Sequence, residues 1–262
     1  MNTSRNCIIG LAFAVLFLFA ANGRADLTVD FGVDINDHSR WGDVPLYQLF
    51  NQYFSSQLPA LYESGNDLFN DRGVDPYTDW TTSGSQLVGA FKVAAMAHVL
   101  SMLDSQGNTV AQLLDLQGSI GENPLGITDL GNMTVTNIPD GLHVNFQLHA
   151  YADNLPQHNY LFSSNPEENA DGKIHMLAFD ITDLYNAKYG TNNDSVYMFA
   201  WEDMPWENLP LPNSLVDWDY EDFVFIMTNI KPTSSTLVPG PATLAVLGLG
   251  LAGLGLTVRR RK

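Results

Sequence analysis

The stretch LHVNFQLHAY, residues Leu142–Tyr151, decides the fold class of this chain. Its apolar residues alternate with polar or amphipathic ones, so an extended conformation places the two kinds on opposite faces. A turn sequence, Pro139-Asp140-Gly141, comes directly before it. The stretch therefore predicts a strand with one buried and one solvated face, which is typical of antiparallel sheets.

The segments upstream of this strand add a hairpin. Leu87–Leu103 suits either a helix or a strand, but the turn-forming cluster Asp104-Ser105-Gln106-Gly107-Asn108 follows it. His98–Leu103 and Thr109–Leu114 can then pair on either side of that turn. This favours strands over helices in the middle of the chain.

One amphipathic helix is expected to cover the sheet. After Pro45, apolar residues recur at three- and four-residue spacings over Leu46–Tyr62, with an interruption or end near Pro59. The following segment, Ser64–Gly84, is rich in Asp and Asn and is predicted as a solvated loop. Together these patterns predict one mainly β domain over residues 26–231, an antiparallel β-sandwich or jelly-roll-like fold with one amphipathic helix.

Charge narrows the choice of partners. The chain has 29 acidic residues, all between Asp26 and Asp222, and only six basic residues lie within residues 26–231. The net charge of that region is therefore −23. Such a surface repels nucleic acid and anionic lipid and favours cations or cationic partners. Solubility outside the cell would explain the same charge.

The N-terminus has the three parts of a secretory signal peptide. Arg5 provides a positive charge, Ile8–Ala21 is an apolar run of 14 residues, and Gly23-Arg24-Ala25 precedes a cleavage position before Asp26. The run is short for the alternative, an N-terminal membrane helix. Cys7 is the only cysteine and lies in the removed segment, so the mature chain forms no internal disulfide.

The C-terminal segment starts with a turn-forming sequence, Val238-Pro239-Gly240-Pro241. Ala242–Val258 follows, 17 mostly apolar residues at the short end of what spans a bilayer as a helix. The chain closes with Arg259, Arg260, Arg261 and Lys262, which hold a membrane segment on the cytoplasmic side. By hydropathy alone, residues 232–262 form a linker and a C-terminal transmembrane helix.

This tail resembles the PEP-CTERM sorting domain of exported bacterial proteins, although Gly240 stands where that family has Glu. The resemblance implies export through the inner membrane and a place on the cell envelope surface or outside the cell. It also implies a membrane-bound precursor and processing by an exosortase-type transpeptidase. A plain membrane anchor is the alternative.

Residues Lys173–Ile230 resemble a domain of unknown function from secreted bacterial proteins. The shared features are an aromatic strand ending in Glu202-Asp203 and the run Asp217-Trp218-Asp219-Tyr220-Glu221-Asp222, which matches an Asp-x-Asp-Tyr-x-Asp motif. The resemblance implies calcium binding. The candidate ligands are the six carboxylates Glu202, Asp203, Asp217, Asp219, Glu221 and Asp222.

The residues themselves leave two explanations open for the acidic run. In an extended chain Asp217, Asp219 and Glu221 share one face, and calcium needs six to eight oxygens, so Glu202 and Asp203 would help complete the shell. The alternative is that the charges protect the start of the apolar strand Phe223–Met227 from edge pairing. The run lacks the glycine and final glutamate of an EF-hand.

Other functional residues carry weaker signals. Trp201, Trp206 and Trp218 could form an exopolysaccharide-binding face or belong to the core. Glu202, Asp203, Asp217 and Asp219 could supply the two carboxylates of a hydrolase. No two of the six histidines have close metal-ligand spacing, so all are predicted as surface or half-buried residues. We expect a non-enzymatic surface or matrix protein that is stabilised by calcium.

Overall fold

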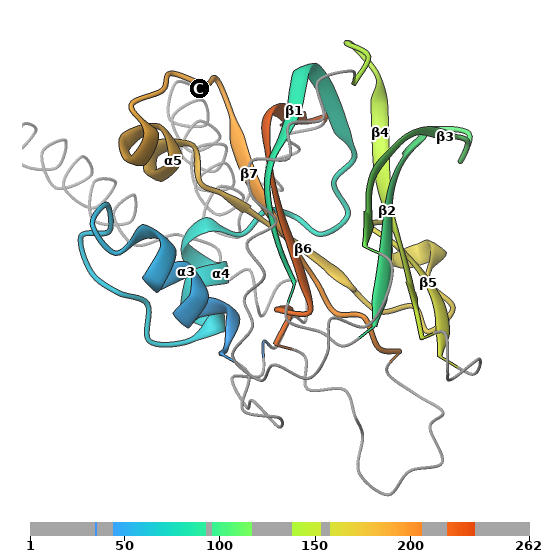
Figure 1. The fold of residues 1–262 in the computed structure, drawn as a ribbon, viewed down its shortest axis with the longest axis horizontal. Helices are drawn as coiled ribbons and strands as arrows, with labels where there is room; N and C mark the ends of the chain where they lie inside the picture. The colour runs from blue at the N-terminus through green and yellow to red at the C-terminus, as the bar shows by residue number, and fades with distance from the viewer. Residues whose placement is uncertain are drawn as a thin grey trace, which may run out of the picture. The chain divides into compact units, whose positions relative to one another are not determined.

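An antiparallel sheet of eight strands organises the structure (Figure 1). The computed structural model describes residues 35, 44–92, 96–116, 138–152, 158–205 and 219–233, which all lie within one compact unit, Leu27–Ser234. The strands are β1 (Trp80–Lys92), β2 (Ala97–Asp104), β3 (Thr109–Leu116), β4 (His143–Tyr151), β5 (Asn159–Ser163), β6 (Met176–Asp180), β7 (Val196–Trp201) and β8 (Phe223–Pro232). Their order is β3-β2-β4-β1-β8-β7-β6, and β5 pairs with β4. The prediction of a mainly β, antiparallel fold is confirmed.

The alternating stretch forms β4. Val144, Phe146, Leu148 and Ala150 are buried, and the residues between them are half-buried or exposed. The predicted hairpin is also present, because β2 and β3 pair around the turn with Leu103 opposite Thr109. Local alternation and a local turn were sufficient to predict both features.

β1 connects the two halves of the sheet. It pairs with β8 from Trp80 to Lys92, but it pairs with β4 only through Trp80 and Thr81. Its ladder with β8 shifts register twice, between Thr82 and Gln86 and between Leu87 and Gly89, and such irregularities bend and twist a strand. We call β2–β5 the first half of the sheet and β6–β8 the second half.

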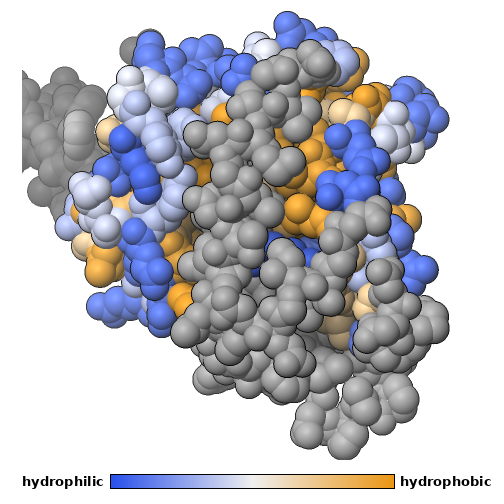
Figure 2. Space-filling view, in the orientation of Figure 1, coloured by the Kyte–Doolittle hydropathy of each residue, from blue (hydrophilic) through white to orange (hydrophobic). Residues whose placement is uncertain are grey.

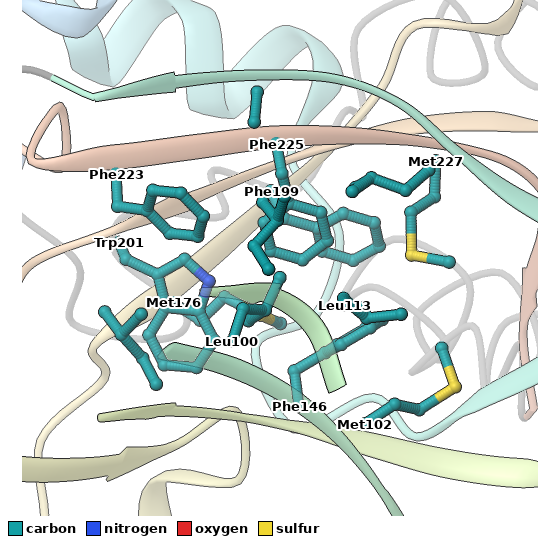
Figure 3. Packing of buried hydrophobic residues seen from close by; sticks show 14 of the residues in the cluster. Leu100, Met102, Leu113, Phe146, Met176, Phe199, Trp201, Phe223, Phe225 and Met227 are labelled. Atoms are coloured by element: carbon teal, nitrogen blue, oxygen red, sulfur yellow. The ribbon is translucent and has the colours of Figure 1, made fainter. Parts of the chain in front are cut away.

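The two halves face each other across one apolar core. The ring of Phe146 on β4 lies 4.9 Å from that of Phe199 on β7 and 5.3 Å from that of Phe225 on β8. Figure 3 shows the aromatic side chains of the second half reaching toward Leu100, Met102 and Phe146 of the first. One continuous sheet therefore covers both sides of its own core.

The helices differ from the prediction. The first, α3 (Leu46–Phe54), ends before Pro59 and is shorter than the predicted Leu46–Tyr62 helix. Two further α-helices, α4 (Gly65–Arg72) and α5 (Thr182–Tyr189), and a 3-10 turn at Pro166–Glu168 are also present. The prediction of a single helix, and of a loop throughout Ser64–Gly84, is wrong.

The missed helix α4 has a physical explanation. Its sequence, GNDLFNDR, has little helical amphipathicity and several residues with weak helix propensity. The side chain of Ser64 caps it by accepting a hydrogen bond from the Asp67 amide at 3.1 Å. Leu68 and Phe69 are fully buried, so tertiary packing rather than local propensity stabilises this helix.

The three helices cover the outer face of the second half (Figure 1). Phe50 and Phe54 of α3 pack in a second apolar cluster with Phe69 of α4, Leu184 of α5 and buried residues of β6–β8. Arg72 also donates two hydrogen bonds to the Asp183 carboxylate, which links α4 to α5. β7 is therefore buried on both faces, as its entirely buried sequence requires.

The predicted signal peptide, residues 1–25, lies outside the described residues. The predicted linker and membrane segment, residues 232–262, also lies outside them except for Pro232, which ends β8, and Thr233. Of the helices that the described ranges contain, none combines the length and the apolar character needed to cross a bilayer. Figure 2 shows hydrophilic side chains along most of the coloured rim of one face, with apolar side chains nearer its middle.

Candidate metal centre

The pairing of β7 with β8 brings two acidic segments together. The last residue of β7, Trp201, lies opposite the first residue of β8, Phe223. Glu202 and Asp203 directly follow β7, and Asp222 directly precedes β8. In an antiparallel pair these positions meet at the same end of the two strands.

Most of these carboxylates are buried. Glu202 is 1% exposed, Asp203 2%, and Asp222 is half-buried. Asp219 and Glu221 are also buried. Since β8 lies between β1 and β7, these side chains do not protect an exposed sheet edge. The edge-protection explanation is therefore wrong for this strand.

Three carboxylates converge closely enough to share an ion. Glu202, Asp203 and Asp222 each offer an oxygen, and these oxygens lie within 4.8 Å of one another. Oxygens on opposite sides of one calcium ion are separated by about 4.6–5.2 Å, twice the usual ligand distance. The Asp203 amide donates to Asp222 Oδ2 at 2.9 Å, which holds the two segments in this arrangement.

The backbone at Tyr220 changes which carboxylates meet. Its φ of 58° is left-handed, so the extended alternation expected for the acidic run does not hold there. The Tyr220 ring is buried in the second apolar cluster, and its hydroxyl donates to the Ile174 carbonyl at 2.8 Å. Burial raises the Tyr220 pKa well above its usual value. A bulky residue in this conformation is strained, and such strain is concentrated at functional sites.

The six predicted ligands therefore separate into three groups. Glu202, Asp203 and Asp222 come together as described. Asp219 and Glu221 are buried beside Tyr220, with the Glu221 amide 3.4 Å from Asp219 Oδ1, but they are not part of the close group. Asp217 lies outside the described residues, as do Trp206 and Trp218.

Two residues that the sequence did not reveal complete the site. His98, on β2, is fully buried, and its Nε2 lies 2.7 Å from Asp203 Oδ2. Burial, and then the charge of Lys92, lowers the His98 pKa well below its usual value. The imidazole is therefore neutral, and Nε2–H donates to the carboxylate. The Nδ1 atom has no hydrogen-bond partner in the described part of the chain.

Lys92, the last residue of β1, is the second residue at the site that the sequence did not reveal. Its side chain is 2% exposed, and its Nζ likewise has no hydrogen-bond partner within the described ranges. Burial lowers the Lys92 pKa, while the charges of Asp203 and Asp222 act in the opposite direction. Buried polar atoms are normally satisfied. The Lys92 ammonium can only donate, so it requires an acceptor such as ordered water, whereas the unprotonated His98 Nδ1 can accept a hydrogen bond or bind a metal ion.

His175 supports the site from the other side. Its Nδ1 lies 3.1 Å from the Glu202 carbonyl oxygen, and its Nε2 lies 2.9 Å from Asp171 Oδ2. The ring is fully buried and stacks on Phe162 at 3.9 Å. The prediction that all six histidines are surface or half-buried residues is wrong for His98 and His175. Their partners are distant in sequence, so local spacing gave no signal.

The tryptophans do not form an exposed platform in the described part of the chain. Trp201 is fully buried in the core, and Trp80 is 1% exposed. This burial counts against a glycan-binding face built on Trp201. Comparisons of the chain with protein families, curated proteins and solved structures find no match.

Proposed function

We propose that this protein is a non-enzymatic exported protein of the cell surface or extracellular matrix, stabilised by calcium at Glu202, Asp203 and Asp222. The observation that carries the proposal is the convergence of three largely buried carboxylate oxygens within 4.8 Å. Two buried carboxylates and a half-buried one repel each other when ionised, and the repulsion is strong in a medium of low dielectric constant. A hard divalent cation relieves this repulsion, and oxygen ligands are those that calcium prefers.

The architecture supports a structural role for the ion. The three carboxylates lie where β7 ends and β8 begins, and both strands are central to the two apolar clusters. An ion held there would tie the ends of these strands together. We assign the fold to the β-sandwich class, because the two halves of the sheet enclose one core. Glu202 and Asp203 are almost inaccessible, which disfavours the alternative of a hydrolase acting on a bulky substrate.

Calcium should raise the melting temperature of the metal-stripped full-length chain, and magnesium should raise it less. A ligand that binds only the folded state adds about 2.7 kcal/mol of stability at one hundred times its dissociation constant. Magnesium has a smaller effect because it dehydrates reluctantly and demands stricter geometry. The measurement is a thermal melt in detergent, with each ion in turn.

Asp222→Asn should remove most of the calcium-dependent shift, because it removes one ligand charge. The matched control is Asp194→Asn, since the Asp194 side chain is 80% exposed and makes only a 3.5 Å surface ion pair with Lys231. If calcium does not move the melting temperature of the unmodified chain, the proposed function is wrong.

The second part of the proposal is the location of the protein, at the cell surface or outside the cell. The signal-peptide pattern at the N-terminus and the tail Val238–Lys262 support it. Sequencing of the mature protein from its own organism should find Asp26 at the N-terminus. Replacing Arg259, Arg260 and Arg261 by serine should reduce retention of the precursor in the membrane fraction, because the basic cluster fixes its orientation. A mature chain that still begins at Met1 would contradict export through a cleaved signal peptide.

A further inference from the structure

We propose that Lys92 determines the charge selectivity of this site, limiting its affinity for calcium and disfavouring trivalent cations. The inference rests on the proposed function, because it concerns the same three carboxylates. It goes further in assigning a role to a residue that is not a ligand and in naming the class of ion that the site accepts.

The strand register places Lys92 at the site. Lys92 on β1 lies opposite Phe223 on β8, the residue that follows Asp222. Directly opposed residues of an antiparallel pair project to the same face of the sheet. On that face the His98 ring lies 5.3 Å from the Phe223 ring and contacts Asp203. The Lys92 side chain therefore runs along the wall of the site.

The Lys92 side chain is almost inaccessible to solvent. Its side chain is 2% exposed, and Asp203 and Asp222 are the acidic groups whose charges act on it. Its Nζ has no hydrogen-bond partner among the described residues, and its low exposure means that bulk solvent screens its charge only weakly. A buried, weakly solvated ammonium acts over a longer range than an exposed one.

The charges then match a divalent ion. Carboxylates that bind a cation are ionised, so with an ion bound the three of them carry −3 and the Lys92 ammonium carries +1, which leaves −2 over these four groups. One divalent cation neutralises this sum, whereas a trivalent cation leaves a positive charge buried. An uncompensated buried charge is costly, so Lys92 weakens trivalent binding more than divalent binding.

The test replaces Lys92 by methionine, which keeps much of the side-chain length and removes the charge. Isothermal titration of the full-length chain in detergent would measure calcium and terbium(III) separately. Repulsion between Lys92 and the ion scales with the charge of the ion. We expect calcium affinity to rise at least about tenfold and terbium affinity at least about thirtyfold, the same energy per unit charge.

Two variants control for other effects. Lys92→Arg keeps the charge and should leave the terbium-to-calcium affinity ratio unchanged. Lys231→Met removes a lysine whose side chain is 51% exposed and should change neither affinity. If Lys92→Met does not fold without metal, it is refolded in calcium and the ion is withdrawn by competition with a chelator of known affinity.

The outcomes separate the two proposals. If the unmodified chain binds calcium but Lys92→Met leaves the terbium-to-calcium ratio unchanged, the role of Lys92 is refuted while the calcium site stands. If neither protein binds calcium or terbium, both proposals fall. A threefold or larger rise in the ratio, absent in Lys92→Arg, establishes Lys92 as the residue that sets the charge of the site.

Discussion

Replacing Phe199 by alanine should lower the free energy of unfolding by about 3–5 kcal/mol, the usual cost of truncating a fully buried phenylalanine. Phe199 is completely buried on β7. Its ring stacks on Phe225 at 4.7 Å and contacts Phe146 at 4.9 Å and Trp80 at 4.8 Å. It therefore touches both halves of the sheet and the strand that joins them, so the cavity would open where the two halves meet.

Chemical denaturation of the two proteins would measure this loss. Leu161→Ala is the matched control, because Leu161 is 58% exposed and its truncation creates no cavity. Its expected effect is within about 0.5 kcal/mol, as for most surface substitutions. Similar losses for the two variants would mean that Phe199 is not at the centre of the core.

Raising the pH from 10 to 12 should destabilise the fold through two buried tyrosines. Burial, followed by the charge of Asp180, raises the Tyr197 pKa to about 12. Burial raises the Tyr220 pKa in the same direction. The unfolded chain loses these protons near pH 10 while the folded chain keeps them, so stability falls as the pH rises between the two values. Tyr197 alone should account for about 2 kcal/mol at pH 12.

Denaturation at a series of pH values would test this dependence. Tyr197→Phe keeps the ring and removes the titrating hydroxyl, so its stability should fall less steeply above pH 10. Tyr189→Phe is the control, because Tyr189 is 47% exposed and should leave the slope unchanged. A free energy of unfolding that stays constant from pH 10 to 12 in the unmodified chain is incompatible with buried, neutral tyrosines.

The sequence predicted what depends on neighbouring residues. The alternation in β4 and the turn between β2 and β3 are local patterns, and the structure has both. Helix α4 was missed because buried Leu68 and Phe69, rather than a helical apolar stripe, hold it in place. Such packing depends on partners far along the chain, which no window of the sequence contains.

For the metal site, too, the sequence predicted the local features and missed those that depend on distant residues. Glu202, Asp203 and Asp222 were among the predicted ligands, because their residue type and position beside apolar strands are visible in the sequence. An extended backbone around Tyr220 would have placed Asp219 and Glu221 on one face and Asp222 on the other. The backbone at Tyr220 is left-handed instead, and the sequence does not predict this conformation. Lys92 reaches the site through the pairing of β1 with β8, and His98 through packing of β2 against the second half of the sheet. Both contacts join residues more than one hundred positions apart in the sequence.

The position of β8 has a consequence for how the chain becomes folded. β8 is the last of the described strands in the sequence but lies between β1 and β7, near the middle of the sheet. A chain that is made from its N-terminus therefore presents β1 and β7 with unpaired edges until Phe223–Pro232 has emerged. Contacts between segments so distant in sequence form slowly. Completion of the sheet must therefore wait until nearly the whole polypeptide has been made, and until then β1 and β7 cannot be paired by β8.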